Sequence, residues 1–178
     1  MFIVCPLKCM NIKAPPTANG TVSMMTKNET AAWLLEHDHY CILTHARPDG
    51  DTIGSATALC VGLRQLGKTA YVLYNAEVSD RFAWLQEGLT KEAVQENDTV
   101  VSVDVASPGM LPKAFEHLLG NIRLRIDHHS SATSFTDCEL VDGGSASCAE
   151  LVWDVLEAAG VTMSKEIAEA VYVGVSTD

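Results

Sequence analysis

Strand-like runs in this chain lead directly into clusters of aspartate and histidine, and this pattern restricts the possible folds more than any other feature. Residues 40–44 read YCILT, with the apolar and β-branched content of a buried strand. His45, Asp49 and Asp51 follow, and then an apolar pattern at helical spacing that Gly67 ends. The three polar side chains therefore belong to a loop between the carboxyl end of a strand and the amino end of a helix. Ligands bind at such loops in open α/β sheets.

Two further strands end in the same way. The run TVVSV at 99–103 precedes Asp104, and the run IRLRI precedes the triplet Asp127-His128-His129. Helical patterns alternate with these strands, which predicts an α/β fold with a mostly parallel sheet flanked by helices on both faces. Because the carboxyl ends of parallel strands share one edge of a sheet, we expect the three clusters to meet there.

The remaining elements follow the same alternation. We expect a strand at 70–74, a helical turn at 81–85, helices at 26–36, 110–119 and 151–159, a short strand at 139–141, and an apolar run at 167–175 that ends near Asp178. Ser147 and Glu150 have the spacing of a capping box. Residues 1–24 contain Pro, Gly and polar residues without periodicity, so we expect a disordered extension there and a folded domain at 25–178.

Composition excludes several classes of function. The chain has 178 residues, 47% of them hydrophobic, which suits one globular domain. Its net charge of -11 argues against a broad surface for duplex DNA or an acidic membrane. Six cysteines form no CxxC pair, which indicates a reducing, cytoplasmic setting. No apolar run is long enough to span a membrane, and the amino-terminal residues lack the features of a secretory signal.

Carboxylates gathered at one sheet edge repel one another unless a cation neutralises them. Carboxylate and imidazole ligands without thiolate suit a divalent ion such as Mn or Mg, with Fe, Co and Zn as competitors. The clusters hold enough ligands for two ions, and a two-ion site clamps the attacking and leaving oxygens in phosphoryl transfer.

Each cluster alone has a simpler structural explanation. Asp49-Gly50-Asp51 can be a turn in which Asp51 only caps the helix, and Asp104 can be an ordinary loop carboxylate. The two histidines can form a partly buried polar connection. The joint placement of all three clusters favours a functional site.

The motifs together resemble a known group of enzymes. His45-Ala46-Arg47-Pro48-Asp49-Gly50-Asp51, Val103-Asp104, Asp127-His128-His129 and Ser176-Thr177-Asp178 resemble the four motifs of the DHH phosphoesterase superfamily. The resemblance runs over residues 26–178. The connecting stretches GSATALCVGLRQLGK and SASCAELVWDVLEAAG are most similar to the branch of bacterial oligoribonucleases (nanoRNases) and adenosine bisphosphate phosphatases.

This resemblance implies a set of roles. One Mn ion would be bound by His45, Asp49 and Asp104, and a second by Asp51, Asp104, His128 and Asp178, with Asp104 between the two ions. His129 would face the substrate phosphate, and Asp127 would orient a histidine that binds metal. Asp104, Asp127 and His129 are therefore the residues expected to take part in catalysis.

The resemblance also implies an activity. We expect a Mn-dependent phosphoesterase that hydrolyses short single-stranded oligoribonucleotides or nucleotide 3'-phosphates such as adenosine 3',5'-bisphosphate. Members of this branch continue into a smaller C-terminal domain that grips the substrate, so we expect the chain to be truncated before that domain. The alternatives are an inorganic pyrophosphatase, a cyclic dinucleotide phosphodiesterase, and a metal-binding remnant without catalysis. Asp49-Gly50-Asp51 counts against the first of these, because pyrophosphatases usually carry Asp-Thr-Asp there.

Overall fold

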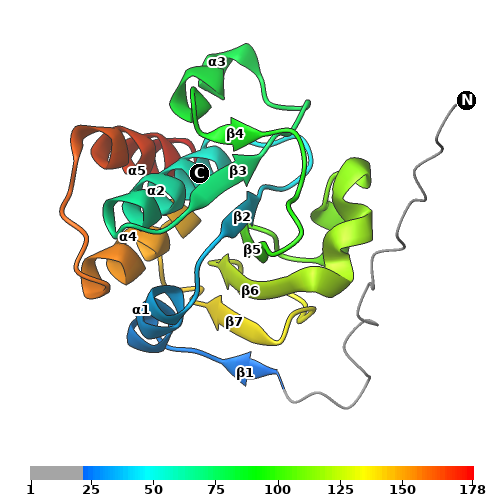
Figure 1. Ribbon diagram of the computed structural model, residues 1–178, viewed down its shortest axis with the longest axis horizontal. Coiled ribbons are helices and arrows are strands. Elements are labelled where there is room, and N and C mark those ends of the chain that lie inside the picture. The colour runs from blue at the N-terminus through cyan, green and yellow to red at the C-terminus, as the bar shows by residue number, and fades with distance from the viewer. Residues whose placement is uncertain (1–21) are drawn as a thin grey trace, which may run out of the picture.

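A seven-stranded parallel sheet forms the centre of the protein, whose computed structural model describes residues 22–178 (Figure 1). In chain order the strands are β1 (Ser23–Met24), β2 (Tyr40–Leu43), β3 (Ala70–Leu73), β4 (Thr90–Lys91), β5 (Thr99–Val103), β6 (Ile122–Asp127) and β7 (Cys138–Val141). Across the sheet their order is β1-β7-β6-β5-β2-β3-β4, and every neighbouring pair is parallel. The chain runs outward from β2 to β4 and returns to place β5 beside β2. This change of direction creates a switch point, where a crevice opens outside the carboxyl ends of the two strands.

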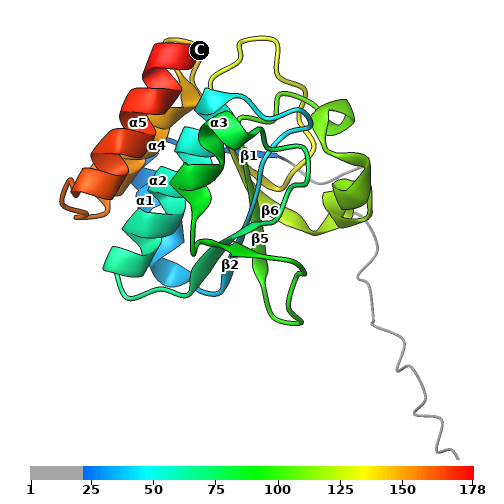
Figure 2. The same ribbon diagram turned by 90° about the horizontal axis from the view of Figure 1, so that it is seen from above.

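Helices cover both faces of the sheet, as the sequence predicts, but the two faces differ. The α-helices are α1 (Lys27–Glu36), α2 (Gly50–Gln65), α3 (Asp80–Ala83), α4 (Cys148–Ala158) and α5 (Lys165–Thr177). Of these, α1, α2, α4 and α5 lie together on one face (Figure 2). The other face is covered mainly by loops and by the 3₁₀ helices η2 (Pro108–Met110) and η3 (Lys113–Asn121), while a third, η1 (Trp84–Gln86), follows α3.

The central strands are buried on both sides, which explains why their sequences are continuously apolar. All four residues of β2 are buried: Ile42 belongs to the core beneath the α-helices, whereas Cys41 and Leu43 belong to a second core on the other face. The 3₁₀ helix η3 closes the second core with Phe115 and Leu118. These two residues are three positions apart, the spacing that a 3₁₀ helix aligns on one side. In place of the single helix expected at 110–119, the structure has the two short 3₁₀ helices η2 and η3.

Glycines allow α2 and α5 to pack closely. A Cβ atom on Gly54 would lie only 2.4 Å from the Ala170 carbonyl oxygen and 3.0 Å from the backbone nitrogen of Gly174, both on α5. Contacts this short are impossible for real side chains, so the helices approach each other through bare backbone. The packing places the end of α5, and with it Asp178, beside the start of α2.

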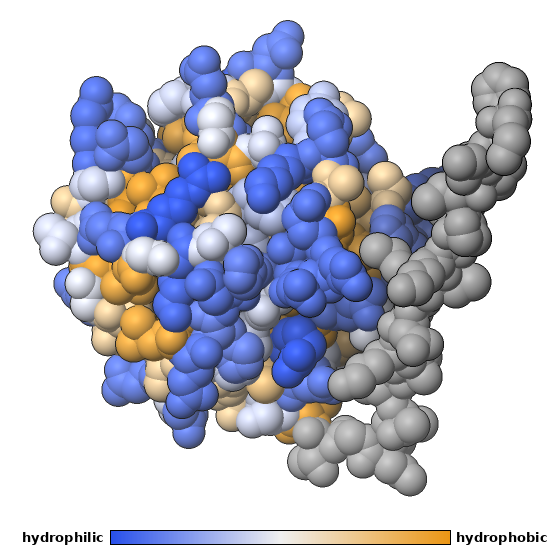
Figure 3. Space-filling view, viewed as in Figure 1, coloured by the Kyte–Doolittle hydropathy of each residue, from blue (hydrophilic) through white to orange (hydrophobic). Residues whose placement is uncertain are grey.

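Some boundaries differ from the sequence-based expectation. Ser23 and Met24 form β1 beside β7, so the sheet includes two residues assigned to the amino-terminal extension, and residues 1–21 lie outside the described part of the chain. Strands β1 and β4 have two residues each, too few for a recognisable pattern. No helix among residues 22–178 is long and apolar enough to span a membrane. Hydrophilic residues cover most of the face shown in Figure 3.

Candidate metal centre

The loop between β2 and α2 places His45 and Asp49 beside the end of β5. His45 is almost fully buried, and its Nε2 lies 3.6 Å from Asp49 Oδ1 and 3.5 Å from Asp104 Oδ2. Asp49 is the N-cap of α2, since its Oδ1 accepts hydrogen bonds from the backbone N–H groups of Asp51 (3.0 Å) and Thr52 (3.2 Å). Asp49 therefore both starts the helix and presents a carboxylate to His45.

Asp51 has a different role from the helix cap considered for it in the sequence. It is fully buried, and its two oxygens accept hydrogen bonds from the first backbone N–H groups of α4, Cys148 (2.8 Å) and Ala149 (2.9 Å). The amino end of a helix favours negative charge, so α4 stabilises this carboxylate. Asp51 Oδ2 also lies 3.7 Å from His128 Nε2. The interaction joins the start of α2 to the loop that follows β6.

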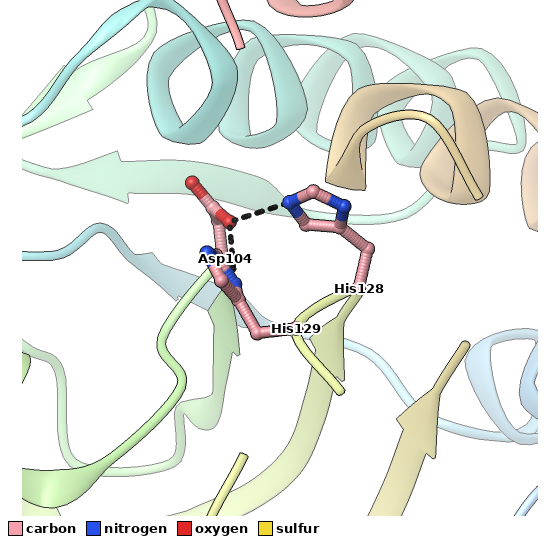
Figure 4. A group of neighbouring side chains, drawn as sticks. All are labelled: Asp104, His128 and His129. Atoms are coloured by element: carbon pink, nitrogen blue, oxygen red, sulfur yellow. Dashed lines mark ion pairs between the residues drawn. The ribbon is translucent and has the colours of Figure 1, made fainter. Parts of the chain in front are cut away.

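Asp104 occupies the centre of the site with a strained backbone. It is buried and adopts a φ of 59°, in the left-handed region that aspartate tolerates better than most residues. Such a conformation costs on the order of 1–3 kcal/mol and is concentrated at functional sites. Its carboxylate faces His45 on one side and the two histidines on the other, with Oδ1 lying 3.9 Å from His128 Nε2 and 3.5 Å from His129 Nδ1 (Figure 4).

The two histidines of the triplet at the end of β6 contact different groups. Asp127 Oδ1 accepts hydrogen bonds from the backbone N–H of His129 (3.3 Å) and pairs with His129 Nδ1 (2.8 Å). The Nδ1 of His128 lies 3.4 Å from the Ser145 carbonyl oxygen. Asp127 thus orients His129, the residue expected to face the substrate, whereas a backbone carbonyl contacts the ring of His128.

Asp178 reaches the site from the end of α5. Its Oδ1 lies 3.6 Å from His128 Nε2, and its side chain is about one-third exposed. The close packing of α2 and α5 through glycine brings this residue to the edge formed by the strand ends. Every residue that the sequence predicted for the site is therefore found at one edge of the sheet.

Among residues 22–178, three groups of side chains offer donor atoms to a metal ion, and the atoms within each group lie within 4.8 Å of one another. The groups are His45, Asp49 and Asp104; Asp51, His128 and Asp178; and Asp104, His128 and His129. Asp104 belongs to two of them.

Two buried atoms at the centre have no hydrogen-bond partner among the described residues. Asp104 Oδ1 and His128 Nε2 are both fully covered and unpaired. Buried polar atoms are normally satisfied, so an unpaired acceptor beside an unpaired imidazole nitrogen needs an explanation. The histidine nitrogens and carboxylate oxygens lie 3.5–3.9 Å apart, which is too far for hydrogen bonds. Two atoms that bind the same metal ion, each at about 2.1 Å from it, are separated by such distances. The residues present fit a divalent metal ion.

Burial and mutual charge shift the pKa values of this group. Burial raises the pKa of Asp104 to about 6, although His45 opposes the shift. Burial lowers the pKa of His45, but the carboxylates of Asp104 and Asp49 outweigh this and raise it to about 10. Asp49 has a lowered pKa because of His45, and Asp51 has a raised pKa because of burial. The raised pKa of His45 favours the protonated imidazole beside these carboxylates.

Sequence reasoning missed several residues that shape the site. Asn75 donates from Nδ2 to Thr44 Oγ1 (3.1 Å) and to the His45 carbonyl oxygen (3.1 Å), which fixes the end of β2. Arg125 and Glu139 form a buried ion pair beneath the segment that follows His129. The sequence contains one indication of this pair, because each of the two predicted strands includes a charged residue.

Comparison with known proteins identifies the family. The sequence model of the DHH family, N-terminal domain, matches residues 39–175, which is most of the chain. The chain belongs to the DHH family. Within this family, 139 residues are 33% identical to the bifunctional oligoribonuclease and PAP phosphatase NrnA of Thermus thermophilus. That match covers 77% of this chain and 42% of the relative, so the chain spans less than half of the relative's length.

The fold of this chain also occurs in solved structures of other proteins. An exopolyphosphatase-related protein from Bacteroides fragilis matches with a TM-score of 0.62 and 23% identity, over 83% of this chain and 48% of that one. RecJ from Thermus thermophilus in complex with Mn matches with a TM-score of 0.53 and 20% identity, over 93% of this chain and 25% of that one. The DHH fold predicted from the sequence is therefore confirmed.

Proposed function

We propose that this chain contains the catalytic centre of a Mn-dependent phosphoesterase. The observation that carries the proposal is the shared use of Asp104 by two groups of metal donors, together with the unpaired buried atoms Asp104 Oδ1 and His128 Nε2. Metal binding would satisfy both atoms and neutralise the surrounding carboxylates. Mn is the ion in the RecJ complex, which supports this choice among divalent ions.

His45, Asp49 and Asp104 would hold one ion, and Asp51, Asp104, His128 and Asp178 would hold the other. When bound, the two ions would stabilise the negative charge that develops on phosphate oxygens and would make water a better nucleophile near neutral pH. The protein would fix the ligands in advance: Asp49 through the start of α2, Asp51 through the start of α4, and Asp104 through its strained backbone.

His129 would bind the substrate phosphate. Its side chain is 38% exposed, and its Nδ1 is engaged by Asp127 Oδ1. With Nδ1 engaged, Nε2 is the ring nitrogen that remains to donate to a phosphate oxygen when the ring is protonated. Burial opposes protonation, but the carboxylate of Asp127 outweighs it and raises the pKa of His129. A proton held on this ring would favour a negatively charged ligand.

The proposed substrates are short oligoribonucleotides and nucleotide 3'-phosphates such as adenosine 3',5'-bisphosphate. Support comes from the NrnA relative, which is described as an oligoribonuclease and PAP phosphatase. A strongly acidic chain is unsuited to long stretches of duplex DNA, whereas a small phosphate ester can be bound through metal ions and His129.

Metal binding is the first test. Dialysis against Mn followed by metal analysis should give up to two ions per chain, and Asp104→Asn should weaken both sites. Asp80→Asn makes the same chemical change at an exposed residue of α3, so Mn binding should be unaffected. A stoichiometry below one in the folded native chain contradicts the proposal.

Hydrolysis is the second test. A diribonucleotide, adenosine 3',5'-bisphosphate, pyrophosphate and a cyclic dinucleotide are each incubated with the Mn-loaded chain. Turnover of either of the first two, abolished by Asp104→Asn and retained by Asp80→Asn, supports the proposal. Exclusive turnover of pyrophosphate or the cyclic dinucleotide assigns a different phosphoesterase. Mn binding without hydrolysis of any substrate supports the alternative of a metal-binding remnant.

A further inference from the structure

The segment that follows His129 is held by a buried ion pair that no metal ligand requires. Arg125 on β6 and Glu139 on β7 are direct neighbours in the parallel register, and both are almost fully buried. Arg125 Nη2 donates to Glu139 Oε2 over 2.6 Å. Removing two charges from water is expensive, so a buried pair needs further hydrogen bonds to be tolerated. The partners of these hydrogen bonds show which part of the protein the ion pair holds in place.

The hydrogen bonds of Glu139 go to the segment that returns from His129 to β7. Its Oε1 accepts from the backbone N–H groups of Phe135 (2.9 Å) and Thr136 (3.2 Å), and from Thr136 Oγ1 (3.2 Å). Its Oε2 accepts from Ser134 Oγ (3.0 Å) in addition to Arg125. The carboxylate thus replaces the regular backbone partners that this loop lacks.

Arg125 connects the same segment to the loop that carries Asp104. Its Nη1 donates to the Thr133 carbonyl oxygen (3.1 Å) and to the Ala106 carbonyl oxygen (3.3 Å). The backbone N–H of Thr133 also donates to Ala106 (2.8 Å). The guanidinium therefore joins the loops that follow β5 and β6, using the planar fork that distinguishes arginine from lysine.

Asp127 links this pair to His129. Its Oδ2 has no hydrogen-bond partner among the described residues and lies 3.8 Å from Arg125 Nη1. Its Oδ1 engages the backbone and the ring of His129. The positive charge of Arg125 thus lies behind the carboxylate that orients the histidine, and the same side chain fixes the loop on which the histidine sits.

We propose that Arg125 and Glu139 are positioning residues, whose ion pair holds residues 128–137 so that His129 keeps its orientation toward the substrate phosphate. The inference rests on the proposed phosphoesterase function for its catalytic consequence. Its structural part, that the pair fixes His129, stands on the contacts above. A pair that served only general stability would have no particular connection to His129, and this difference can be measured.

The main variant replaces the whole pair by apolar side chains, Arg125→Met with Glu139→Leu, because removing one partner alone would leave a buried charge. Lys27→Met is the matched control: it removes the partly exposed ion pairs of Lys27 with Asp154 (2.6 Å) and Asp142 (3.6 Å), and it touches neither Arg125 nor Glu139. Arg125→Lys is a second variant that keeps the charge but cannot reproduce the fork. It provides the test if the double variant does not fold.

The first measurement does not depend on activity. Amide hydrogen exchange of His129, Phe135 and Thr136 is followed by NMR in the metal-free chain. We expect exchange to accelerate by about tenfold or more in the double variant and by less in Arg125→Lys, with amides of α2 unchanged in both. Lys27→Met should leave all of these rates unchanged. Native exchange at His129 in both Arg125 variants would overturn the proposal, whatever the chain hydrolyses.

The second measurement asks whether the pair acts through His129. In the native background, the double variant should lower kcat/KM by about 100-fold, since small misplacements near the reacting atoms have effects of this size. In a His129→Ala background the same change should lower it by less than about threefold, because the residue being positioned is already absent. Equal losses in both backgrounds would overturn the proposal.

The two proposals fail in different ways. Faster exchange at His129 in the double variant, combined with no hydrolysis by the native chain, would reject the phosphoesterase function while supporting the positioning role. Hydrolysis by the native chain, combined with native exchange and native kcat/KM in the double variant, would reject the positioning role and support the phosphoesterase function.

Discussion

The α2–α5 helix pair holds its site residues by close backbone packing, whereas the segment 128–137 is held by buried polar side chains. Asp49, Asp51 and Asp178 belong to helices whose contact surface contains Gly54 and Gly174. His128 and His129 begin a loop that relies on Arg125 and Glu139 for many of its hydrogen bonds. Packed helices form a rigid frame with little adjustment. A loop with polar anchors can place a side chain where no regular element reaches, but it depends on a few specific contacts.

The largest effect is expected where the two regions meet. Asp104→Asn should weaken Mn binding at both donor groups and reduce hydrolysis by more than about 100-fold, exceeding the usual effect of residues that merely support metal ligands. His45→Ala should weaken mainly one group, because it belongs only to the group with Asp49 and Asp104. Titration of each variant with Mn, followed calorimetrically, distinguishes the two. Small and equal effects would show that Asp104 does not join the two regions.

The helix side can be disturbed through its glycines. Gly54→Ala would place a Cβ atom 2.4 Å from the Ala170 carbonyl oxygen, so α2 and α5 must separate. We expect the free energy of unfolding to fall by about 1–3 kcal/mol, as for other overpacked sites, and Mn affinity to fall with it as Asp178 moves. Gly109→Ala is the control, because no atom lies within 4 Å of its added Cβ. Denaturant unfolding of both variants measures the difference, and equal stability would contradict close packing as the source of rigidity.

Mn binding should become tighter as pH rises, since the metal replaces protons at the β2–α2 end of the site. Asp104 must be ionised to bind, and burial raises its pKa to about 6. His45 must lose the proton that its raised pKa of about 10 retains in the metal-free chain. Where one proton is displaced, the affinity should rise by about tenfold per pH unit. In a His45→Gln variant the rise between pH 7 and 9 should disappear, as measured by calorimetry. A slope that persists in this variant would assign the proton to another group.

The smallest expected effect lies on the loop side. Ser134→Ala removes one hydrogen bond to Glu139 Oε2 (3.0 Å), which still accepts from Arg125. The free energy of unfolding should fall by about 0.5–1.5 kcal/mol, with faster amide exchange confined to residues 133–136. Ser164→Ala on the helix side removes the N-cap of α5, whose Oγ accepts from the Ile167 backbone N–H (3.3 Å), and should destabilise by a similar amount. Only Ser134→Ala should alter exchange at the loop.

The sequence by itself determined the alternation of strands and helices and the residues at the strand ends. Hydrophobic runs such as β2 and β5 must be buried on both faces, and a chain that alternates them with amphipathic helices forms a parallel sheet. The carboxyl ends of parallel strands share one edge, so His45, Asp104 and Asp127 had to come together. The sequence pattern predicted most of the helices and strands. The structure places every residue predicted for the site at one edge of the sheet.

Only the tertiary structure decided how those residues are held. The order of the strands places the switch point between β2 and β5, and pattern alone does not fix that order. The hydrogen bonds between Asp51 and the start of α4 join residues almost one hundred positions apart, and the contact of Gly54 with α5 joins residues more than one hundred positions apart. In the sequence, Arg125 and Glu139 are charged residues within two separate strands, and only the register of β6 against β7 shows that they are neighbours. Sequence patterns report which side chains must be buried or exposed, whereas partners distant in the chain are chosen by the packing of the whole molecule.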